Sequence, residues 1–242
     1  MEKVDILAIG IHPDDVELSA AGCLLRHGDM GYSFGLLDLS AGEMGTRGDA
    51  LTRRAEALAA AQILGARFRV QLDLPDALFT HTPEHWLKVA RIIRATQPEI
   101  VLCNAPDDRH PDHGRAARLC AEACFYAGLQ KIETFDDAGR PQQAWHPKAV
   151  YHYIQDRQLQ PDFVVDISPW FAQKMQAILA FKSQFHDPNA PPDMPQTPIS
   201  GPDFLQFMEA KARVFGRSIQ AEYAEGFLVG RVPGVDNLFH LR

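Results

Sequence analysis

Residues Ile6 to Cys23 read ILAIGIHPDDVELSAAGC, and this stretch decides the expected fold. The run from Val4 to Ile11 is short, apolar and rich in β-branched residues, which predicts a buried strand. The strand ends at the polar cluster His12 to Asp15, and the apolar residues from Val16 to Arg26 have helical spacing. Strand-to-helix turns open at the carboxyl edge of a parallel sheet, where α/β proteins place their ligands.

Strands and helices are expected to alternate along most of the chain. Further strands are predicted at 32–39, 68–74, 99–105, 149–154, 163–167 and 222–232. Further helices are predicted at 50–64, 83–97, 114–127, 169–184 and 204–220. This order predicts an α/β fold with a doubly wound, mostly parallel sheet and helices on both faces.

The chain of 242 residues is long enough for one well-filled α/β domain, and it shows no internal repeat. We expect a single domain over residues 1–242, with a core at 1–130 and a C-terminal part at 145–242 that completes the pocket. The tract 186–202 contains six prolines and no clear period, so it is expected to be a loop with the potential to act as a lid.

Composition excludes several classes of function. The net charge of −7, without a basic block, disfavours a nucleic-acid partner. No apolar run approaches the roughly 20 residues of a membrane span, and no leader precedes the first strand, so a cytoplasmic protein is expected. The four cysteines lie in predicted core elements, which favours buried thiols over a disulfide framework or a metal pair at Cys120 and Cys124.

A second polar cluster follows the fourth predicted strand, where residues His110 to His113 read HPDH. In doubly wound sheets the first and fourth strands are neighbours at the point where the winding reverses. This adjacency is expected to bring His110–His113 against His12–Asp15. Two clusters that lie far apart in the sequence would then form one site.

The combined clusters predict a catalytic metal centre. Imidazole and carboxylate ligands without thiolate suit Zn2+, and Fe2+ accepts the same set. The best candidate ligands are His12, Asp15 and His113, and three protein ligands leave a position open. Asp14 would then be free to act as general base. Such a centre predicts hydrolysis of an amide or ester.

Two further residues of the second cluster have expected catalytic roles. His110, when protonated, could stabilise an oxyanion or protonate a leaving amine. Asp112 could orient His110 by accepting a hydrogen bond from its second nitrogen.

The motifs resemble those of the LmbE-like, or PIG-L, zinc-dependent deacetylases. They stand here as Ile11-His12-Pro13-Asp14-Asp15 and His110-Pro111-Asp112-His113, and the loop Gly42-Glu43-Met44-Gly45-Thr46-Arg47-Gly48 is also similar. The likeness extends over nearly the whole chain and is greatest to the branch that deacetylates N-acetylglucosaminyl malate in bacillithiol biosynthesis.

The resemblance implies a Rossmann-like fold and the same metal ligands and base. It also implies a small-molecule sugar substrate and a homo-oligomer, often a hexamer. Ile11 replaces the family's common alanine, which should only adjust packing.

Arg53 and Arg109 are candidate substrate-binding residues. An arginine in a helix rich in Ala and Leu is usually a solvated residue, and that is the simpler interpretation of Arg53. However, Arg53 follows the glycine-rich loop and Arg109 directly precedes His110. Because a guanidinium binds carboxylates in a bidentate manner, one or both are predicted to hold the malate or another anionic group of the substrate.

Other functions remain open at this stage. Within the enzyme class, an amidase for thiol conjugates or a deacetylase of the diacetylchitobiose type would use the same centre. A sugar- or nucleotide-binding module that contains a metal is the alternative from a different class. Two features argue against a binding module. Asp14 would have no role in a site that only holds a metal, and the first strand-to-helix turn lacks the Gly-x-Gly-x-x-Gly motif of dinucleotide-binding proteins.

Overall fold

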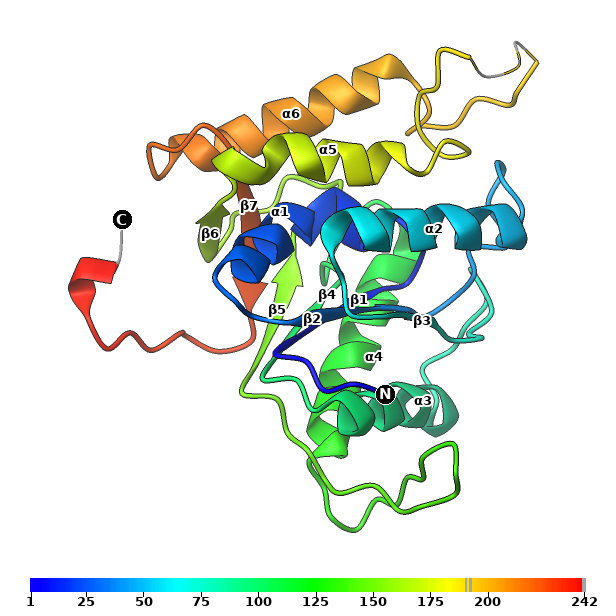
Figure 1. Ribbon diagram of the computed structural model, residues 1–242, viewed down its shortest axis with the longest axis vertical. Helices are drawn as coiled ribbons and strands as arrows, with labels where there is room; N and C mark the ends of the chain where they lie inside the picture. The colour runs from blue at the N-terminus through cyan, green and yellow to red at the C-terminus, as the bar shows by residue number, and fades with distance from the viewer. Residues whose placement is uncertain (190, 192, 241–242) are drawn as a thin grey trace.

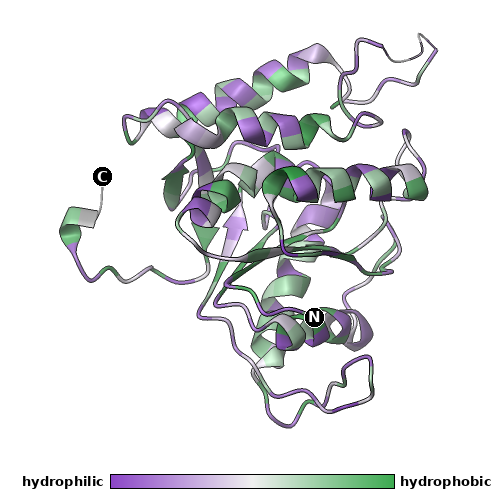
Figure 2. Ribbon diagram, viewed as in Figure 1, coloured by the Kyte–Doolittle hydropathy of each residue, from purple (hydrophilic) through white to green (hydrophobic). Residues whose placement is uncertain are grey.

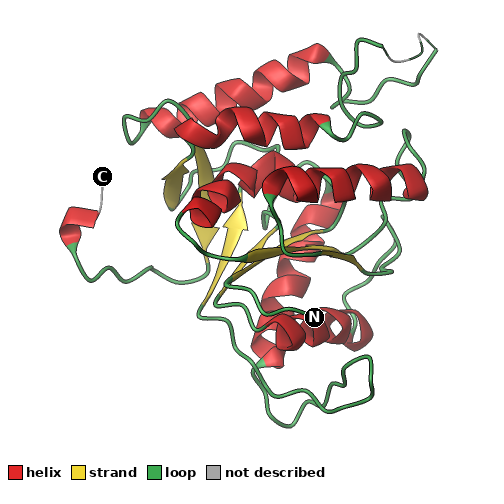
Figure 3. Cartoon of the chain, in the orientation of Figure 1, coloured by secondary structure: helices red, strands yellow, loops and turns green. Residues whose placement is uncertain are grey.

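The computed structural model describes residues 1–189, 191 and 193–240, and in them a seven-stranded sheet lies between layers of helices (Figures 1 and 3). The strand order is β3-β2-β1-β4-β5-β7-β6, and β7 alone runs antiparallel to its neighbours. The strands are β1 (Ile6–Gly10), β2 (Phe34–Asp38), β3 (Arg69–Gln71), β4 (Ile100–Cys103), β5 (Ala149–Tyr153), β6 (Phe163–Asp166) and β7 (Ala224–Val229).

Helices cover both faces of the sheet, which confirms the predicted α/β class. Helices α1 and α2 lie on one face with α5 and α6 stacked beyond them, and α3 and α4 lie on the other face (Figure 1). The helices are α1 (Asp15–Asp29), α2 (Ala50–Leu64), α3 (Pro83–Thr96), α4 (Pro111–Ala127), α5 (Phe171–Leu179) and α6 (Pro202–Arg217), with short 3-10 turns η1 (Ser168–Trp170) and η2 (Leu238–His240).

Strand β1 lies at the centre of the sheet and separates two hydrophobic cores. Ile6 and Ala8 pack into the core beneath α1, α2 and α5, whereas Leu7 and Ile9 pack into the core against α3 and α4. Figure 2 shows hydrophobic and hydrophilic residues alternating along the helices, as expected where one face of a helix is buried. Burial on both faces explains why the first strand is continuously apolar instead of alternating.

The predicted pairing of the first and fourth strands is confirmed. In the register of β1 with β4, Ile6 lies opposite Ile100 and Ala8 lies opposite Leu102, with the strands parallel. Both strands therefore end at the same edge of the sheet, where the two polar clusters follow.

Several elements begin or end away from the predicted residues. Helix α4 begins at Pro111 and not at Gly114, because proline is well tolerated in a first turn where its missing N–H has no partner. This places Asp112 and His113 within the helix. The helix predicted over 169–184 is shorter, since η1 precedes it and α5 ends at Leu179.

The proline-rich tract 186–202 contains only turns and bends in its described part up to the start of α6, as predicted, although residues 190 and 192 lie outside the described residues. No helix in the described part of the chain is long and apolar enough to cross a membrane. All four cysteines are free and buried, as expected.

Candidate active site

The turn between β1 and α1 holds Asp14 in an unusual backbone conformation. Its φ is 112° and its ψ is −25°, and a positive φ is uncommon for any residue other than glycine. Gly10 leaves room for the turn, because a β-carbon there would lie 2.9 Å from Cβ of Asp15. Backbone strain of this kind costs about 1–3 kcal/mol and is often found at functional sites.

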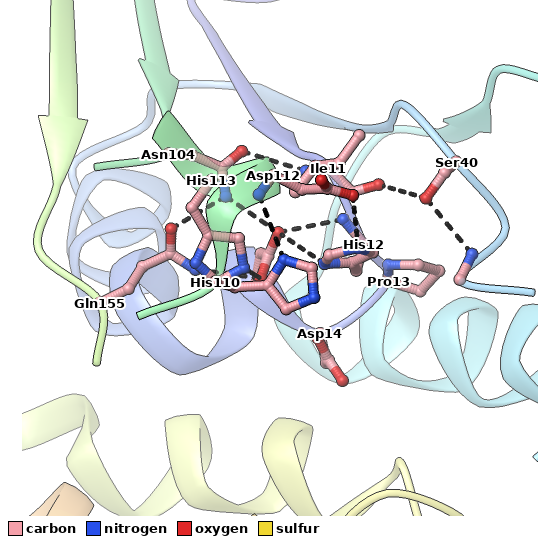
Figure 4. A network of polar contacts seen from close by, with 12 residues as sticks. Ile11, His12, Pro13, Asp14, Ser40, Asn104, His110, Asp112, His113 and Gln155 are labelled. Carbon is pink, nitrogen blue, oxygen red and sulfur yellow. Dashed lines mark hydrogen bonds and ion pairs between the residues drawn. The ribbon is translucent and has the colours of Figure 1, made fainter. Parts of the chain in front are cut away.

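The first turn of α4 brings the second cluster to the same place. The ring centroid of His12 lies 4.8 Å from that of His110 and 5.7 Å from that of His113. Figure 4 shows the three rings gathered beyond the ends of the strands. The predicted meeting of the two clusters is therefore confirmed.

Two carboxylates outside the cluster fix the orientation of His12 and His113. Nε2 of His12 lies 2.9 Å from Oδ1 of Asp76, and Nδ1 of His113 lies 2.5 Å from Oδ2 of Asp108. Carboxylates accept hydrogen bonds, so these nitrogens carry the protons. The opposite nitrogens, Nδ1 of His12 and Nε2 of His113, are left with free lone pairs in the neutral rings.

Those two nitrogens face opposite oxygens of Asp15. Nε2 of His113 lies 3.2 Å from Oδ1, and Nδ1 of His12 lies 3.9 Å from Oδ2. The carboxylate is held in place by Nδ2 of Asn104 at 2.9 Å and Nε2 of Gln155 at 2.9 Å. The two ring nitrogens and the carboxylate of Asp15 are thus neighbours, and each is held in a fixed orientation by its other contacts.

This arrangement suits a divalent cation. Histidines that bind metal usually donate their other nitrogen to a carboxylate, as His12 and His113 do here. Among the described residues, two groups bring donor atoms within 4.8 Å of one another: His12, His110 and His113, and His12, Asp76 and Asp112. The first group contains His12 and His113 of the predicted set, with His110 in place of Asp15. In that second group both carboxylates face Nε2 of His12, the nitrogen that carries the proton, so they fit the role of orienting carboxylates better than that of ligands.

The pKa shifts show that the centre favours positive charge. Burial would lower the pKa of His12, but the nearby carboxylates of Asp112 and Asp76 raise it to about 10. Burial also acts against the protonated His113, yet the charge of Asp15 and the bond to Asp108 raise its pKa to about 9. A cation bound by the free nitrogens would replace the second proton of each ring and neutralise Asp15, while Asp76 and Asp108 keep their hydrogen bonds.

Asp14 lies beside this centre and faces Arg53. Its Oδ2 is 3.2 Å from Nη2 of Arg53, and both side chains are almost fully buried. Burial raises the pKa of Asp14 to about 7, although the charge of Arg53 acts in the opposite direction. A carboxylate with a pKa near neutrality is suited to accept and return a proton.

His110 is the N-cap of α4. Its Nδ1 accepts a hydrogen bond from the backbone N–H of Asp112 at 3.3 Å, so the proton of the neutral ring lies on Nε2. Burial and the charges of His12 and His113 lower the pKa of His110. The neutral ring can therefore donate a hydrogen bond without being protonated.

Asp112 does not lie as the sequence suggested. Its carboxylate was expected to accept a hydrogen bond from His110, but Oδ2 lies 3.7 Å from Nε2 of His12 and accepts the backbone N–H of Ala77 at 2.9 Å. The difference arises because α4 begins at Pro111, so that the backbone of Asp112, and not its side chain, contacts His110.

Both candidate arginines are already engaged. Arg53 is buried, not solvated, and donates to the carbonyl oxygens of Gly42 at 3.0 Å and Pro13 at 2.7 Å as well as to Asp14. Gly42 allows this approach, because a β-carbon there would lie 1.9 Å from Nη1 of Arg53. Arg109 is half-exposed and pairs with Asp156.

The centre opens into a cavity of about 240 Å³. Seven of the eight site residues predicted from the sequence line the cavity, and only Asp112 does not. Apolar residues of α1, α6 and the segment before α6 also line it. The polar groups lie at the sheet edge, so one cavity joins the candidate metal centre to an apolar surface.

Four residues that orient this centre were not predicted from the sequence. Asn104 and Asp108 lie between β4 and the second cluster, and Asp76 lies after β3. A polar residue that follows a strand of a parallel sheet is a candidate for the site, so the sequence offered a signal for these three residues. Gln155, two residues after β5, offers no comparable signal because a single glutamine is common on any surface.

Comparisons with known proteins agree with this architecture. The family described as PIG-L, GlcNAc-PI de-N-acetylase, matches residues 7–124. Diacetylchitobiose deacetylase of Thermococcus kodakarensis is 30% identical over 241 residues, which cover 95% of this chain and 84% of that one. 4-Oxalmesaconate hydratase of Pseudomonas putida is 29% identical over 195 residues, 74% of each chain. The crystal structure of the conserved protein TT1542 from Thermus thermophilus superposes with a TM-score of 0.83 at 34% identity and covers 96% of this chain and 98% of that one.

A single-domain α/β fold with a mostly parallel sheet is therefore shared with the relative from Thermus thermophilus. The chain belongs to the PIG-L, or LmbE-like, family and is an enzyme of the deacetylase type. The resemblance read from the two histidine motifs is thus confirmed at the level of the family.

Proposed function

We propose that this chain is a zinc-dependent hydrolase that removes the N-acetyl group from an N-acetylglucosaminide. One observation carries the proposal: Asp15 lies between Nδ1 of His12 and Nε2 of His113, whose other nitrogens are bound to carboxylates. The relative from Thermococcus, a diacetylchitobiose deacetylase, supports an N-acetylated sugar as the substrate.

His12, Asp15 and His113 would hold the ion. The donor set contains nitrogen and oxygen but no thiolate, which suits Zn2+, and Fe2+ would accept the same ligands. When bound, such an ion polarises a carbonyl and makes water more acidic.

The remaining polar residues would handle the protons. Asp14 takes a proton from the attacking water and returns it to the leaving nitrogen, which its pKa of about 7 allows in both directions. His110 donates a hydrogen bond from Nε2 to the oxyanion that develops on the carbonyl. Asp76 would keep Nδ1 of His12 directed at the ion by accepting the proton of Nε2, and the carboxylate of Asp112, 3.7 Å from the same nitrogen, would support this orientation by its charge.

The narrower substrate, N-acetylglucosaminyl malate of bacillithiol biosynthesis, rests on the resemblance of the motifs. It requires Arg53 or Arg109 to bind the malate carboxylates. Each of these arginines already pairs with a carboxylate of the protein, Asp14 and Asp156 respectively, so a malate group would have to compete with them. A neutral glucosaminide of the diacetylchitobiose type needs no such exchange.

A hydratase is the second candidate, because 4-oxalmesaconate hydratase matches 74% of the chain. Addition of water to a carbon–carbon double bond could use the same base, Asp14. Asp14 would then deliver the proton to carbon and not to an amine.

Assembly and location are also proposals. The homo-oligomer, a hexamer by resemblance to the family, is testable by light scattering of the purified chain. The cytoplasmic location stays a prediction from the sequence.

Acetate release across a panel of compounds tests the proposed function. The panel contains N-acetylglucosaminyl malate, free N-acetylglucosamine, diacetylchitobiose, a mercapturate-type thiol conjugate and, for the hydratase, an unsaturated dicarboxylic acid followed by its ultraviolet absorbance. We expect acetate from at least one glucosaminide, loss of that activity with a chelator and recovery with Zn2+. Turnover of the unsaturated acid alone would contradict the deacetylase and favour the hydratase.

A further inference from the structure

The cavity has an apolar wall opposite the polar centre. Helix α6 contributes Phe204, Phe207 and Met208, whose spacing of three and four residues places them on one face of the helix. Ile199 from the segment before α6 and Leu18 from α1 complete the wall. None of these residues takes part in the proposed proton transfers.

Phe207 stands out within this wall. Its neighbours Phe204 and Met208 are each only 8% exposed, and the ring of Phe204 stacks on that of Phe185 with centroids 5.8 Å apart. Phe207 is 39% exposed, and its ring lies at the cavity. Phe204 and Met208 therefore pack into the core, whereas Phe207 presents aromatic surface that a ligand could cover.

The charges of the cavity do not favour an anionic group against this wall. Arg53 and Arg109 are the arginines among the described lining residues, and the lining also contains the carboxylates of Asp14, Asp15, Asp76 and Asp156. Carboxylates therefore outnumber guanidinium groups, and a divalent cation at the polar centre would offset the excess without reversing it.

Lys211 is a cation close to this wall, although it does not line the cavity. Its Nζ lies 5.9 Å from the centroid of Phe207, but the side chain is buried and Nζ is within 3.4 Å of the carbonyl oxygen of Ile154. It is thus turned towards the protein backbone and supplies no site for a carboxylate on the wall.

We propose that the wall formed by Leu18, Ile199, Phe204, Phe207 and Met208 is a subsite for an apolar substituent carried by the N-acetylated sugar. The inference rests on the proposed function and names its substrate class: an amino-sugar amide whose attached group is apolar and uncharged. Water displaced from the exposed ring of Phe207 would favour binding of such a group. The polar centre fixes the amide, and the wall selects what is attached to the sugar.

Binding measured separately from turnover tests the subsite. The probes are phenyl, methyl and malyl N-acetylglucosaminides of both anomers, added in calorimetry to the zinc-loaded Asp14→Asn variant, which is expected to bind without hydrolysis. We expect the phenyl glycoside to bind about tenfold or more tightly than the methyl glycoside. In the Asp14→Asn background, Phe207→Ala should bring this ratio close to one, whereas Phe207→Leu should retain most of it.

Val214→Ala is the matched control, because Val214 lies on α6 with 58% exposure but does not line the cavity. It should leave the phenyl-to-methyl ratio unchanged. Equal binding of phenyl and methyl probes, tighter binding of the malyl probe, or no binding of any probe would overturn the subsite. Absence of acetate release by the wild-type enzyme would instead overturn the proposed function, so the two failures are distinguishable.

Discussion

The two halves of the cavity differ in origin and in chemistry. The polar half follows β1 and β4, at the point where the sheet reverses its winding, and its side chains are locked by buried hydrogen bonds. The apolar half comes largely from α6, in the last third of the chain, and includes a ring that remains 39% exposed.

The comparison separates the reaction from the choice of substrate. Oriented residues such as His12 and His113 are needed wherever an ion must be held, and they lie in the turn after β1 and in the first turn of α4, which follow buried strands. The residues of α6 that line the cavity, by contrast, can be substituted without disturbing the sheet. The centre is therefore expected to decide whether the reaction occurs, and the wall to decide on which substrate.

The largest expected effect is that of Asp14→Asn on the polar half. Removing the base should lower kcat by about 10²–10⁴-fold, because no proton acceptor remains for the water. Zinc content, measured by atomic absorption, should stay at the wild-type level since Asp14 is not among the proposed ligands. Full activity in this variant would remove Asp14 from the reaction, and lost zinc would make it a ligand.

A second, smaller effect tests the carboxylates that orient the histidines. Asp108→Asn should weaken zinc binding by roughly 10–100-fold, because Nδ1 of His113 loses its charged partner. The matched control is Asp107→Asn, since the side chain of Asp107 is 62% exposed and pairs with Arg157 on the surface. Competition with a chromophoric chelator measures both affinities, and equal values for the two variants would contradict the assignment.

The smallest expected effect is a shift in pH dependence. Asp14 must be deprotonated to act as base, so kcat/KM should rise with pH through its pKa. Burial raises that pKa and the charge of Arg53 lowers it, so Arg53→Gln should move the acidic limb to higher pH, by roughly one to three units. The test compares the two profiles at equal zinc loading, and coincident acidic limbs would show that Arg53 does not act on Asp14.

Much of the polar half could be predicted from the sequence. Continuous apolar strands, each followed by a His-Pro-Asp triplet, predicted both the sheet and the meeting of the two clusters. Asp112 could not be placed in this way, because its partner depends on whether α4 begins at Pro111 or three residues later. One turn of helix decides whether its carboxylate faces His110 or His12.

The apolar half could not be predicted, because phenylalanines at helical spacing usually indicate core packing. Phe204 and Phe207 belong to the same amphipathic pattern and both line the cavity, yet Phe204 is 8% exposed and Phe207 is 39% exposed. The exposure of each phenylalanine depends on where α6 lies over the edge of the sheet, and the local sequence does not predict that position. The burial of Arg53 could not be predicted for the same reason, since it depends on the backbone of Pro13 and Gly42.

The most direct test of the central claim is the position of zinc in a crystal of the chain grown with Zn2+. Anomalous diffraction measured at the zinc absorption edge should give a peak about 2.0–2.2 Å from Nδ1 of His12, Nε2 of His113 and a carboxylate oxygen of Asp15, with Asp14 beside it and unbound. A peak on Nε2 of His12 between Asp76 and Asp112, or no peak at these residues, would contradict the account.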